Sequence, residues 1–396
     1  MTDRLYYSDA RTLDFSATVV AIEDGGRRIV LDRTAFYPTS GGQPHDTGRL
    51  GTAFVMDVID DDERLVHVCA EPLTCVVGDS IDGHVDATRR FDHMQQHSGQ
   101  HLLSALLADA YGWPTVSVHF GAATNTVDVT AANVAPEDVV EIEQRVNRLA
   151  AEDRAIRVSF EDAAQATGLR KPSDRDGLLR IVTIDGVDRS ACGGTHVAST
   201  GEIGSILLRR TERTKGNTRI EFVCGLRAVA RARAEAGLLT AAAKLLTASP
   251  EDVPALIEAH QSRVAELERD RKQLTAELAV HQARARWDAT IPDANDLRHI
   301  MLDPVSGSVQ DAEPVVRALL AMGPCVVLAM SPSTRGLLLG ASESSGLDAG
   351  QTLRKALLAV GGRGGGSPRL AQGAIPDILV IDEICRACGF PSAQDA

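Results

Sequence analysis

The sequence predicts an α+β protein made of a small N-terminal β-barrel, an α+β domain, a helical arm and a small C-terminal α/β module. Residues 1–88 contain short apolar or alternating runs broken by Gly, Asp and Pro, which is the pattern of a small barrel or sandwich. Over 89–225 a long helix-forming stretch is followed by alternating strand-like and helical segments. The stretch 226–290 is rich in Ala, Leu, Glu and Arg and is therefore expected to be helical. Apolar runs around a glycine-rich stretch predict the α/β module at 291–396.

Individual elements follow from the same patterns. In the barrel we expect strands at 16–22, 28–31, 52–59 and 65–69. In the second domain we expect one helix over 94–110, stopped by Gly112 and Pro114, and another over 136–153. Strand-like runs in that domain lie at 116–120, 156–160, 180–184 and 206–208.

The helical arm breaks once, at Ser249 and Pro250, which form an N-cap followed by proline at the first helical position. Apolar residues at heptad spacing in the second helix favour a helical hairpin or a coiled-coil arm, and with it a homodimer. These heptad residues are Ile257, Val264, Leu267, Leu274 and Leu278. In the module that follows, 325–330 and 378–381 are expected to be buried strands around the glycine-rich stretch 361–373.

Composition restricts the class of protein and its surroundings. No run approaches the ~18–20 apolar residues of a membrane span, and the N-terminus lacks the layout of a secretory signal. The seven scattered cysteines argue against a disulfide framework, so we expect a cytoplasmic protein with no membrane partner. The net charge of −13 excludes a broadly basic surface, so any nucleic-acid contact must depend on a local cluster of cations.

Two separated motifs carry the strongest chemical signal. His97 and His101 lie four residues apart in the predicted helix, so both imidazoles project from one face. Cys192 and His196 flank two glycines, which allow a tight loop to turn a thiolate and an imidazole toward one point. Three nitrogen donors and one sulfur donor suit Zn²⁺ and are poor ligands for Mg²⁺ or Ca²⁺. We therefore predict one zinc ion per chain.

Four further segments occur in the order found in one known family. Together with HxxxH and CGGTH they resemble the editing domain of alanyl-tRNA synthetase and its free-standing relatives, the AlaX proteins, in the long form that carries a DHHA1 module. The segments are FYPTSGGQPHDTG at 36–48, TGEIG at 200–204, RIEFVCGLRA at 219–228 and GGRGGGSPRLAQG at 361–373. The resemblance divides the chain into a barrel with a GGQ loop (1–88), a zinc editing domain (89–225), a helical linker (226–290) and a DHHA1-like module (291–396).

The resemblance implies a hydrolase that deacylates mischarged tRNA(Ala). A pocket shaped for alanine rejects serine and glycine by only about 10²-fold, so a second, hydrolytic site is needed for translation fidelity. The substrate would be Ser-tRNA(Ala), and whether Gly-tRNA(Ala) is a second substrate stays open. Because the sequence begins directly in the editing barrel, we expect the chain to act in trans on tRNA charged elsewhere.

The resemblance also implies pocket residues. Gly41 and Gly42 would let the backbone approach the substrate, and Gln43 would offer both a donor and an acceptor. His119 matches a family position beside the substrate, with an ordinary strand histidine as the alternative. Thr39 could supply a hydroxyl that senses the hydroxyl of serine.

Contacts with the tRNA would use two basic segments and the C-terminal module, mostly through shape and backbone. One segment is Arg170-Lys171. The Gly361–Gly366 run lacks the Gly-Lys-Ser/Thr of a P-loop, and Cys385 and Cys388 lack a partner pair for zinc. The other basic segment carries five cations against one carboxylate: Arg209, Arg210, Arg213, Lys215 and Arg219.

Two other functions remain open. Four protein ligands normally close a zinc site, whereas catalysis needs an open position. Either one ligand is labile, or the ion positions the substrate, or the zinc is structural in a non-catalytic tRNA-binding protein. A zinc hydrolase of small esters or amides is the other alternative.

Overall fold

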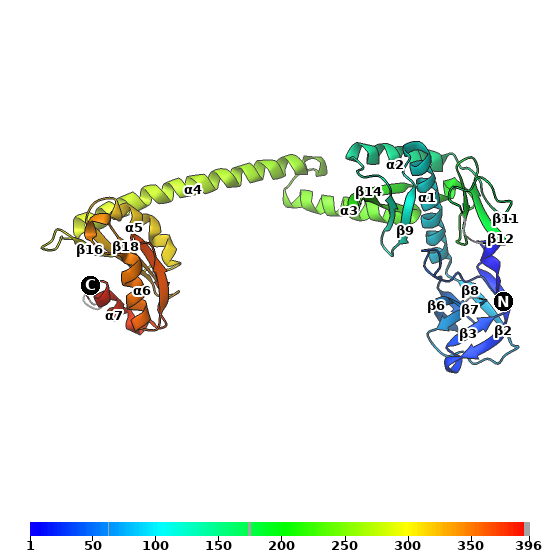
Figure 1. The fold of residues 1–396 in the computed structure, drawn as a ribbon, viewed down its shortest axis with the longest axis horizontal. Helices are drawn as coiled ribbons and strands as arrows, with labels where there is room; N and C mark the ends of the chain where they lie inside the picture. The colour runs from blue at the N-terminus through cyan, green and yellow to red at the C-terminus, as the bar shows by residue number, and fades with distance from the viewer. Residues whose placement is uncertain (62, 173–175, 392–396) are drawn as a thin grey trace. The chain divides into compact units, whose positions relative to one another are not determined.

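A computed structural model describes residues 1–61, 63–172 and 176–391 (Figure 1). Residues 62, 173–175 and 392–396 fall within the predicted domains but lie outside the described residues. The chain divides into two compact units, Met1–Ala242 and Ala243–Ala396. Both contain helices and sheets, so the mixed α+β class is confirmed. In the described part of the chain, no helix has the length and apolar character needed to cross a membrane.

The N-terminal part of the first unit is a sheet of six strands that closes on itself in the order β2-β3-β7-β6-β5-β8. Its interior is filled by apolar side chains such as Ile29, Phe36 and Leu65, none of which is exposed. A short parallel pair, β1 (Asp3–Arg4) with β4 (Arg33–Thr34), lies outside the six. The six strands are β2 (Asp14–Glu23), β3 (Arg28–Leu31), β5 (Gly48–Leu50), β6 (Ala53–Asp61), β7 (Arg64–Cys69) and β8 (Ser80–Val85).

Helix α1 (Ala87–Tyr111) is the central element of the rest of this unit (Figure 1). It begins seven residues before the expected start at 94, because the Asp86 carboxylate accepts hydrogen bonds from the amides of Thr88 and Arg89. It ends at Gly112, whose left-handed φ of 66° closes the last turn. Nearly every side chain from His93 to Leu107 is buried, because α1 contacts α2, β9, β10, β13 and β15.

Two antiparallel sheets and one helix surround α1. Their shared core joins Leu103 of α1 with Phe222 of one sheet and Ile184 of the other. The four-stranded sheet has the order β14-β15-β10-β9 and the three-stranded sheet the order β11-β12-β13. The elements are β9 (Thr115–Phe120), β10 (Asn125–Val129), α2 (Pro136–Ala151), β11 (Ile156–Asp162), β12 (Leu178–Ile184), β13 (Asp188–Ala191), β14 (Ile206–Thr214) and β15 (Asn217–Cys224).

Helices α3 (Gly225–Leu245) and α4 (Val253–Ala289) follow, separated by a 3-10 turn at Pro250–Asp252 where the break was expected. The heptad residues of α4 form an apolar stripe that is between 45% and 63% exposed. Toward its end, Ala279 and Ala283 of α4 are buried, and Ala283 belongs to the core of the second unit.

The second unit holds a five-stranded sheet with helices on both faces. Val327 packs toward Ala283 and helix α5, whereas its neighbours Val326 and Leu328 pack toward α6 and α7, as strand alternation requires. The strand order is β16-β17-β18-β20-β19, with β16 and β17 parallel. The elements are β16 (Arg298–Met301), α5 (Glu313–Leu320), β17 (Cys325–Ser331), β18 (Gly336–Ala341), α6 (Ala349–Ala359), β19 (Arg363–Gly366), β20 (Leu370–Ala374) and α7 (Ile381–Ala387).

One local expectation in this unit is wrong. The segment 378–381 is not a buried strand but a 3-10 turn leading into α7, because Asp377 caps the amide of Leu379, and the Leu379 side chain is 83% exposed. The glycine-rich stretch contains the edge strand β19 (Arg363–Gly366). A Cβ on Gly364 would lie 2.5 Å from Leu357 of α6, so glycine allows the helix to pack directly on the strand.

Candidate metal centre

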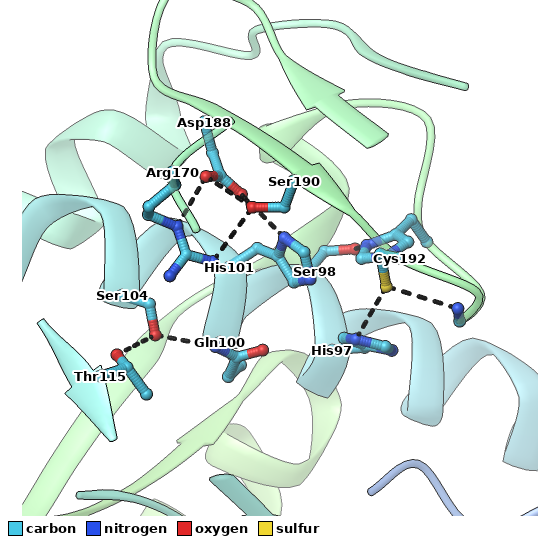
Figure 2. Close-up of polar contacts among 12 residues, drawn as sticks. His97, Ser98, Gln100, His101, Ser104, Thr115, Arg170, Asp188, Ser190 and Cys192 are labelled. Atoms are coloured by element: carbon cyan, nitrogen blue, oxygen red, sulfur yellow. Dashed lines mark hydrogen bonds and ion pairs between the residues drawn. The ribbon is translucent and has the colours of Figure 1, made fainter. Parts of the chain in front are cut away.

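The two predicted motifs meet in the structure. Helix α1 presents His97 and His101, and the loop after β13 presents Cys192 (Figure 2). His196 follows in the same loop. One ligand atom from each residue lies within 4.8 Å of the others. The Sγ atom of Cys192 is 3.4 Å from Nε2 of His97 and 3.4 Å from Nε2 of His196. Residues nearly one hundred positions apart thus form one compact group of donors.

A hydrogen bond to Nδ1 orients each of the three imidazoles. When Nδ1 carries the proton, the lone pair of Nε2 is left for a metal, which is the usual arrangement around zinc-binding histidines. Each partner comes from a different part of the first unit. The three contacts are His97 Nδ1 to Gln43 Oε1 at 2.7 Å, His101 Nδ1 to Asp188 Oδ2 at 2.8 Å, and His196 Nδ1 to Ser98 Oγ at 3.1 Å.

Asp188 has the most elaborate surroundings of these partners. Its carboxylate also accepts hydrogen bonds from Arg170 Nε at 2.7 Å and from Ser190 Oγ at 3.0 Å (Figure 2). Burial alone would raise the pKa of this carboxyl, but His101 and Arg170 lower it to about 2. Asp188 is therefore an anion that pulls the Nδ1 proton of His101 toward itself and makes Nε2 a stronger donor.

The cysteine is held in a state suited to metal binding. Burial would raise the pKa of the Cys192 thiol, but His97 and His196 hold it well below its usual range, which favours the thiolate. The loop is fixed by Arg180, whose guanidinium donates to the carbonyls of Cys192 at 2.7 Å and Gly194 at 3.0 Å. A Cβ on Gly194 would lie 2.1 Å from Cε1 of His97, so glycine is required for the loop to approach the helix.

The donors fit a zinc ion. Zinc is bound at ~2.0–2.1 Å by His nitrogen and ~2.3 Å by Cys sulfur, so neighbouring ligand atoms of a tetrahedral site lie roughly 3.3–3.7 Å apart. The two sulfur–nitrogen distances of 3.4 Å fall in this range, and all four donor atoms lie within 4.8 Å of one another. The set of three nitrogens and one thiolate also matches the ligands that zinc prefers.

The GGQ segment forms a two-residue hairpin turn between the paired residues Ser40 and Gln43. Gly41 and Gly42 occupy the two central positions with φ of 57° and 87°, as a type I′ turn requires. The turn directs the Gln43 side chain into the protein, where it is 1% exposed and bonded to His97 and Thr195.

A cavity of about 980 Å³ opens beside the donors. His97, His101 and Cys192 line it, together with Gly41 and Gly42 of the hairpin turn. Other residues of its wall are aromatic or basic. They include Tyr7, Tyr37, Phe160, Arg170, Lys171 and Arg180.

Other predicted residues lie away from this wall. His119 is an exposed residue of β9, and the cavity is lined instead by its neighbours from Thr115 to Val118. Thr39 is exposed, and its hydroxyl is bonded to His45.

The five predicted tRNA-binding cations lie on the hairpin of β14 and β15. Arg209 and Arg210 both pair with Glu221, and Arg219 pairs with Asp128. Arg213 donates to Asn133, and Lys215 lies at the tip of the hairpin with a φ of 43°.

The orienting groups Asp188 and Ser98 were not predicted from the sequence. Ser98 follows His97 directly, so the sequence already showed a hydroxyl group within HxxxH. This hydroxyl was the available signal for a hydrogen-bond partner of another ligand histidine, His196. Asp188 lies four residues before Cys192 in an ordinary polar stretch, and its role depends on the pairing of β12 with β13.

Comparison with known proteins agrees with this arrangement. The family model described as "Threonyl and Alanyl tRNA synthetase second additional domain" matches residues 179–221, and the model "tRNA synthetases class II (A)" matches residues 7–89. Alanine–tRNA ligase of Pyrococcus abyssi is 32% identical over 96% of this chain and 43% of its own length. The alanyl-tRNA editing protein Aarsd1 of Bos taurus is 34% identical over 66% of this chain and 60% of its own.

Both matching models describe parts of tRNA synthetases, and the first covers the loop that carries Cys192 and His196, so the chain is a relative of tRNA synthetase domains. The alanyl-tRNA editing protein Aarsd1 of Mus musculus is 32% identical over 70% of this chain and 72% of its own length. The chain belongs to the alanyl-tRNA editing protein family. It spans less than two thirds of the length of the Pyrococcus and Bos relatives.

Proposed function

We propose that this chain is a zinc-dependent deacylase that removes serine from mischarged tRNA(Ala). The observation that carries the proposal is the convergence of His97, His101, Cys192 and His196 on one point at the wall of a large cavity. The names of the related editing proteins supply the substrate class. A bound zinc ion would supply a Lewis acid that polarises the ester carbonyl and orients water.

The reaction is the hydrolysis of one ester bond. Water adds to the carbonyl carbon of the aminoacyl group, and the bond from that carbon to the ribose oxygen breaks. The products are the free amino acid and the tRNA with its terminal hydroxyl restored. Three of the four donors, His97, His101 and Cys192, line the cavity, so a substrate in the cavity would meet the cluster on that side.

The size and wall of the cavity support an RNA end as the ligand. The cavity volume of about 980 Å³ lies at the upper end of the ~300–1,000 Å³ typical of small-molecule pockets. This volume is larger than a single amino acid needs. Phe160 is 46% exposed on this wall and offers a stacking surface for an unpaired base. Lys171 adds positive charge suited to a phosphate group.

The proposal is tested by deacylation of tRNA(Ala) charged with serine, glycine or alanine. We expect the zinc-loaded chain to release serine and to leave Ala-tRNA(Ala) intact. Cys192→Ala is expected to remain folded, to bind tRNA and to lose the activity. Cys69→Ala is the control, because Cys69 is likewise a free cysteine but is buried in the barrel strand β7. It should retain the activity.

Each alternative predicts a different result. Zinc-independent release of serine, or full activity of Cys192→Ala, would contradict the proposal. Tight tRNA binding by a zinc-loaded wild-type chain that releases no amino acid would support a structural zinc, a reading favoured by the four protein donors. Activity on small esters without activity on charged tRNA would support the small-ester hydrolase.

A further inference from the structure

The carboxamide of Gln43 joins the barrel to both halves of the donor cluster. Its Oε1 atom lies 2.7 Å from Nδ1 of His97 and accepts the amide hydrogen of Thr195 at 3.1 Å. Its Nε2 atom donates to the hydroxyl of Thr195 at 2.9 Å. Thr195 directly precedes His196, so the Gln43 side chain contacts both helix α1, through His97, and the CGGTH loop, through Thr195.

These contacts fix the position of a proton. The amide of Thr195 can only donate, so the Gln43 atom that it faces must be the carbonyl oxygen and not the nitrogen. The same oxygen faces Nδ1 of His97, which must therefore carry a proton. His97 is thereby held as the Nδ1–H tautomer, and its Nε2 lone pair points toward Cys192 Sγ.

The local fold leaves Gln43 little freedom to move. Gly41 and Gly42 form the tight turn before it, and three residues later the buried carboxylate of Asp46 pairs with Arg90 of α1. Both side chains of that ion pair are at most 1% exposed. The hairpin turn is therefore anchored to helix α1 independently of Gln43. This anchoring holds the carboxamide of Gln43 in one orientation.

We infer that Gln43 is a positioning residue for the metal: it selects the tautomer of His97 and clamps the CGGTH loop against helix α1. The inference rests on the metal-binding part of the proposed function and not on deacylation. Among the three partners of imidazole Nδ1 atoms, Asp188 and Ser98 belong to the α+β domain, whereas Gln43 comes from the barrel. The barrel thus takes part in building the metal site.

The test is zinc affinity of the full chain, measured by competition with a chromogenic chelator. Gln43→Leu removes the acceptor at similar volume and is expected to weaken zinc binding by about 10- to 100-fold, as for other partners of ligand histidines. Gln43→Glu retains an oxygen for His97 and Thr195 and should restore affinity to within a few fold of wild type. Gln96→Leu is the matched control, because Gln96 is equally buried at 1% but bonds to Asn125 and Cys224.

Wild-type affinity in Gln43→Leu would overturn the inference, as would an equal loss in Gln96→Leu. Nitrogen-15 NMR of the metal-free chain gives an independent measurement. The His97 ring should be the Nδ1–H tautomer in the wild type and a mixture in Gln43→Leu, and an unchanged tautomer would contradict the inference. If the wild type binds no zinc, the proposed function fails, but the NMR comparison still tests the positioning role.

Discussion

The carboxylate of Asp188 accepts the Nδ1 hydrogen of His101 at 2.8 Å while Arg170 donates to its other oxygen at 2.7 Å. Asp188 thus links the guanidinium of Arg170 to the imidazole of His101 at the candidate metal centre (Figure 2). The Asp188 side chain is fully buried, so this charge acts with little screening by water. The arrangement strengthens Nε2 of His101 as a donor.

Asp188→Asn is therefore expected to weaken zinc binding by about 10- to 100-fold without unfolding the chain. The amide keeps the shape of the carboxylate but removes the charge that balances Arg170. Chelator competition measures the affinity, and circular dichroism checks the fold. Asp185→Asn is the control, since that carboxylate pairs with Arg157 at an exposed position. Equal zinc affinity in the two variants would contradict the role of Asp188.

The two glycines of the CGGTH loop are expected to differ in their tolerance of a side chain. A Cβ on Gly194 would lie 2.3 Å from Nδ1 of His97, whereas a Cβ on Gly193 would meet nothing closer than 3.6 Å. Gly194→Ala should therefore displace the His97 ring and leave the purified protein with little zinc. Gly193→Ala should retain a full equivalent of zinc in elemental analysis. A full zinc content in Gly194→Ala would show that the loop does not pack on His97 as described.

The stability of the barrel is expected to depend on pH through His67. Its ring is fully buried, accepts from Thr34, contacts the Ile29 carbonyl and adjoins Phe36. Burial lowers its pKa from 6.5 to about 4. Between these values the unfolded chain binds a proton that the folded chain does not, so the free energy of unfolding should fall by about 3 kcal/mol from pH 7 to pH 4.

Urea denaturation of the metal-free chain at pH 7.5 and pH 4.5 measures this term. His67→Gln cannot take up the proton and should lose less stability than the wild type over that range. His84→Gln is the control, because its side chain is 61% exposed on β8 and should leave the pH dependence close to wild type. The prediction fails if all three proteins lose stability in parallel.

The tip of the β14–β15 hairpin is expected to contact the tRNA backbone. Removing two charges with Arg213→Gln and Lys215→Asn should lower the slope of log affinity against log salt by about 1.4 to 1.8, since each phosphate contact contributes about 0.7–0.9. Asparagine tolerates the left-handed backbone of Lys215. Arg28→Gln with Arg64→Gln removes the same charge from the barrel and should leave the slope unchanged. An equal effect of both pairs would argue against a hairpin contact.

The donor cluster was accessible from the sequence because its motifs are local. HxxxH needs only the helical repeat to place two imidazoles on one face, and the glycines of CGGTH mark a close approach. The family membership also followed from motif order, and the related editing proteins confirm it. The apolar runs similarly predicted the strands β9, β11, β12 and β14 of this domain, but not β10, β13 or β15.

The roles of Gln43 and Asp188 were not accessible in this way. Gln43 lies 152 positions from Thr195, and no local pattern shows that a hairpin turn would bury a carboxamide between helix and loop. Asp188 acquires its role from the pairing of β12 and β13. Segment 378–381 failed because an apolar run of four residues does not distinguish a strand from a short helix, and the Asp377 cap decides the outcome.

The central claim is that helix α1 and the CGGTH loop share one zinc ion, and X-ray absorption at the zinc edge tests it most directly. For the zinc-loaded chain we predict a shell with three nitrogens at ~2.0–2.1 Å and one sulfur at ~2.3 Å. Cys192→Ala should lose the sulfur scatterer, whereas Cys69→Ala should keep it. Absence of bound zinc, or a wild-type shell without sulfur, would contradict the account.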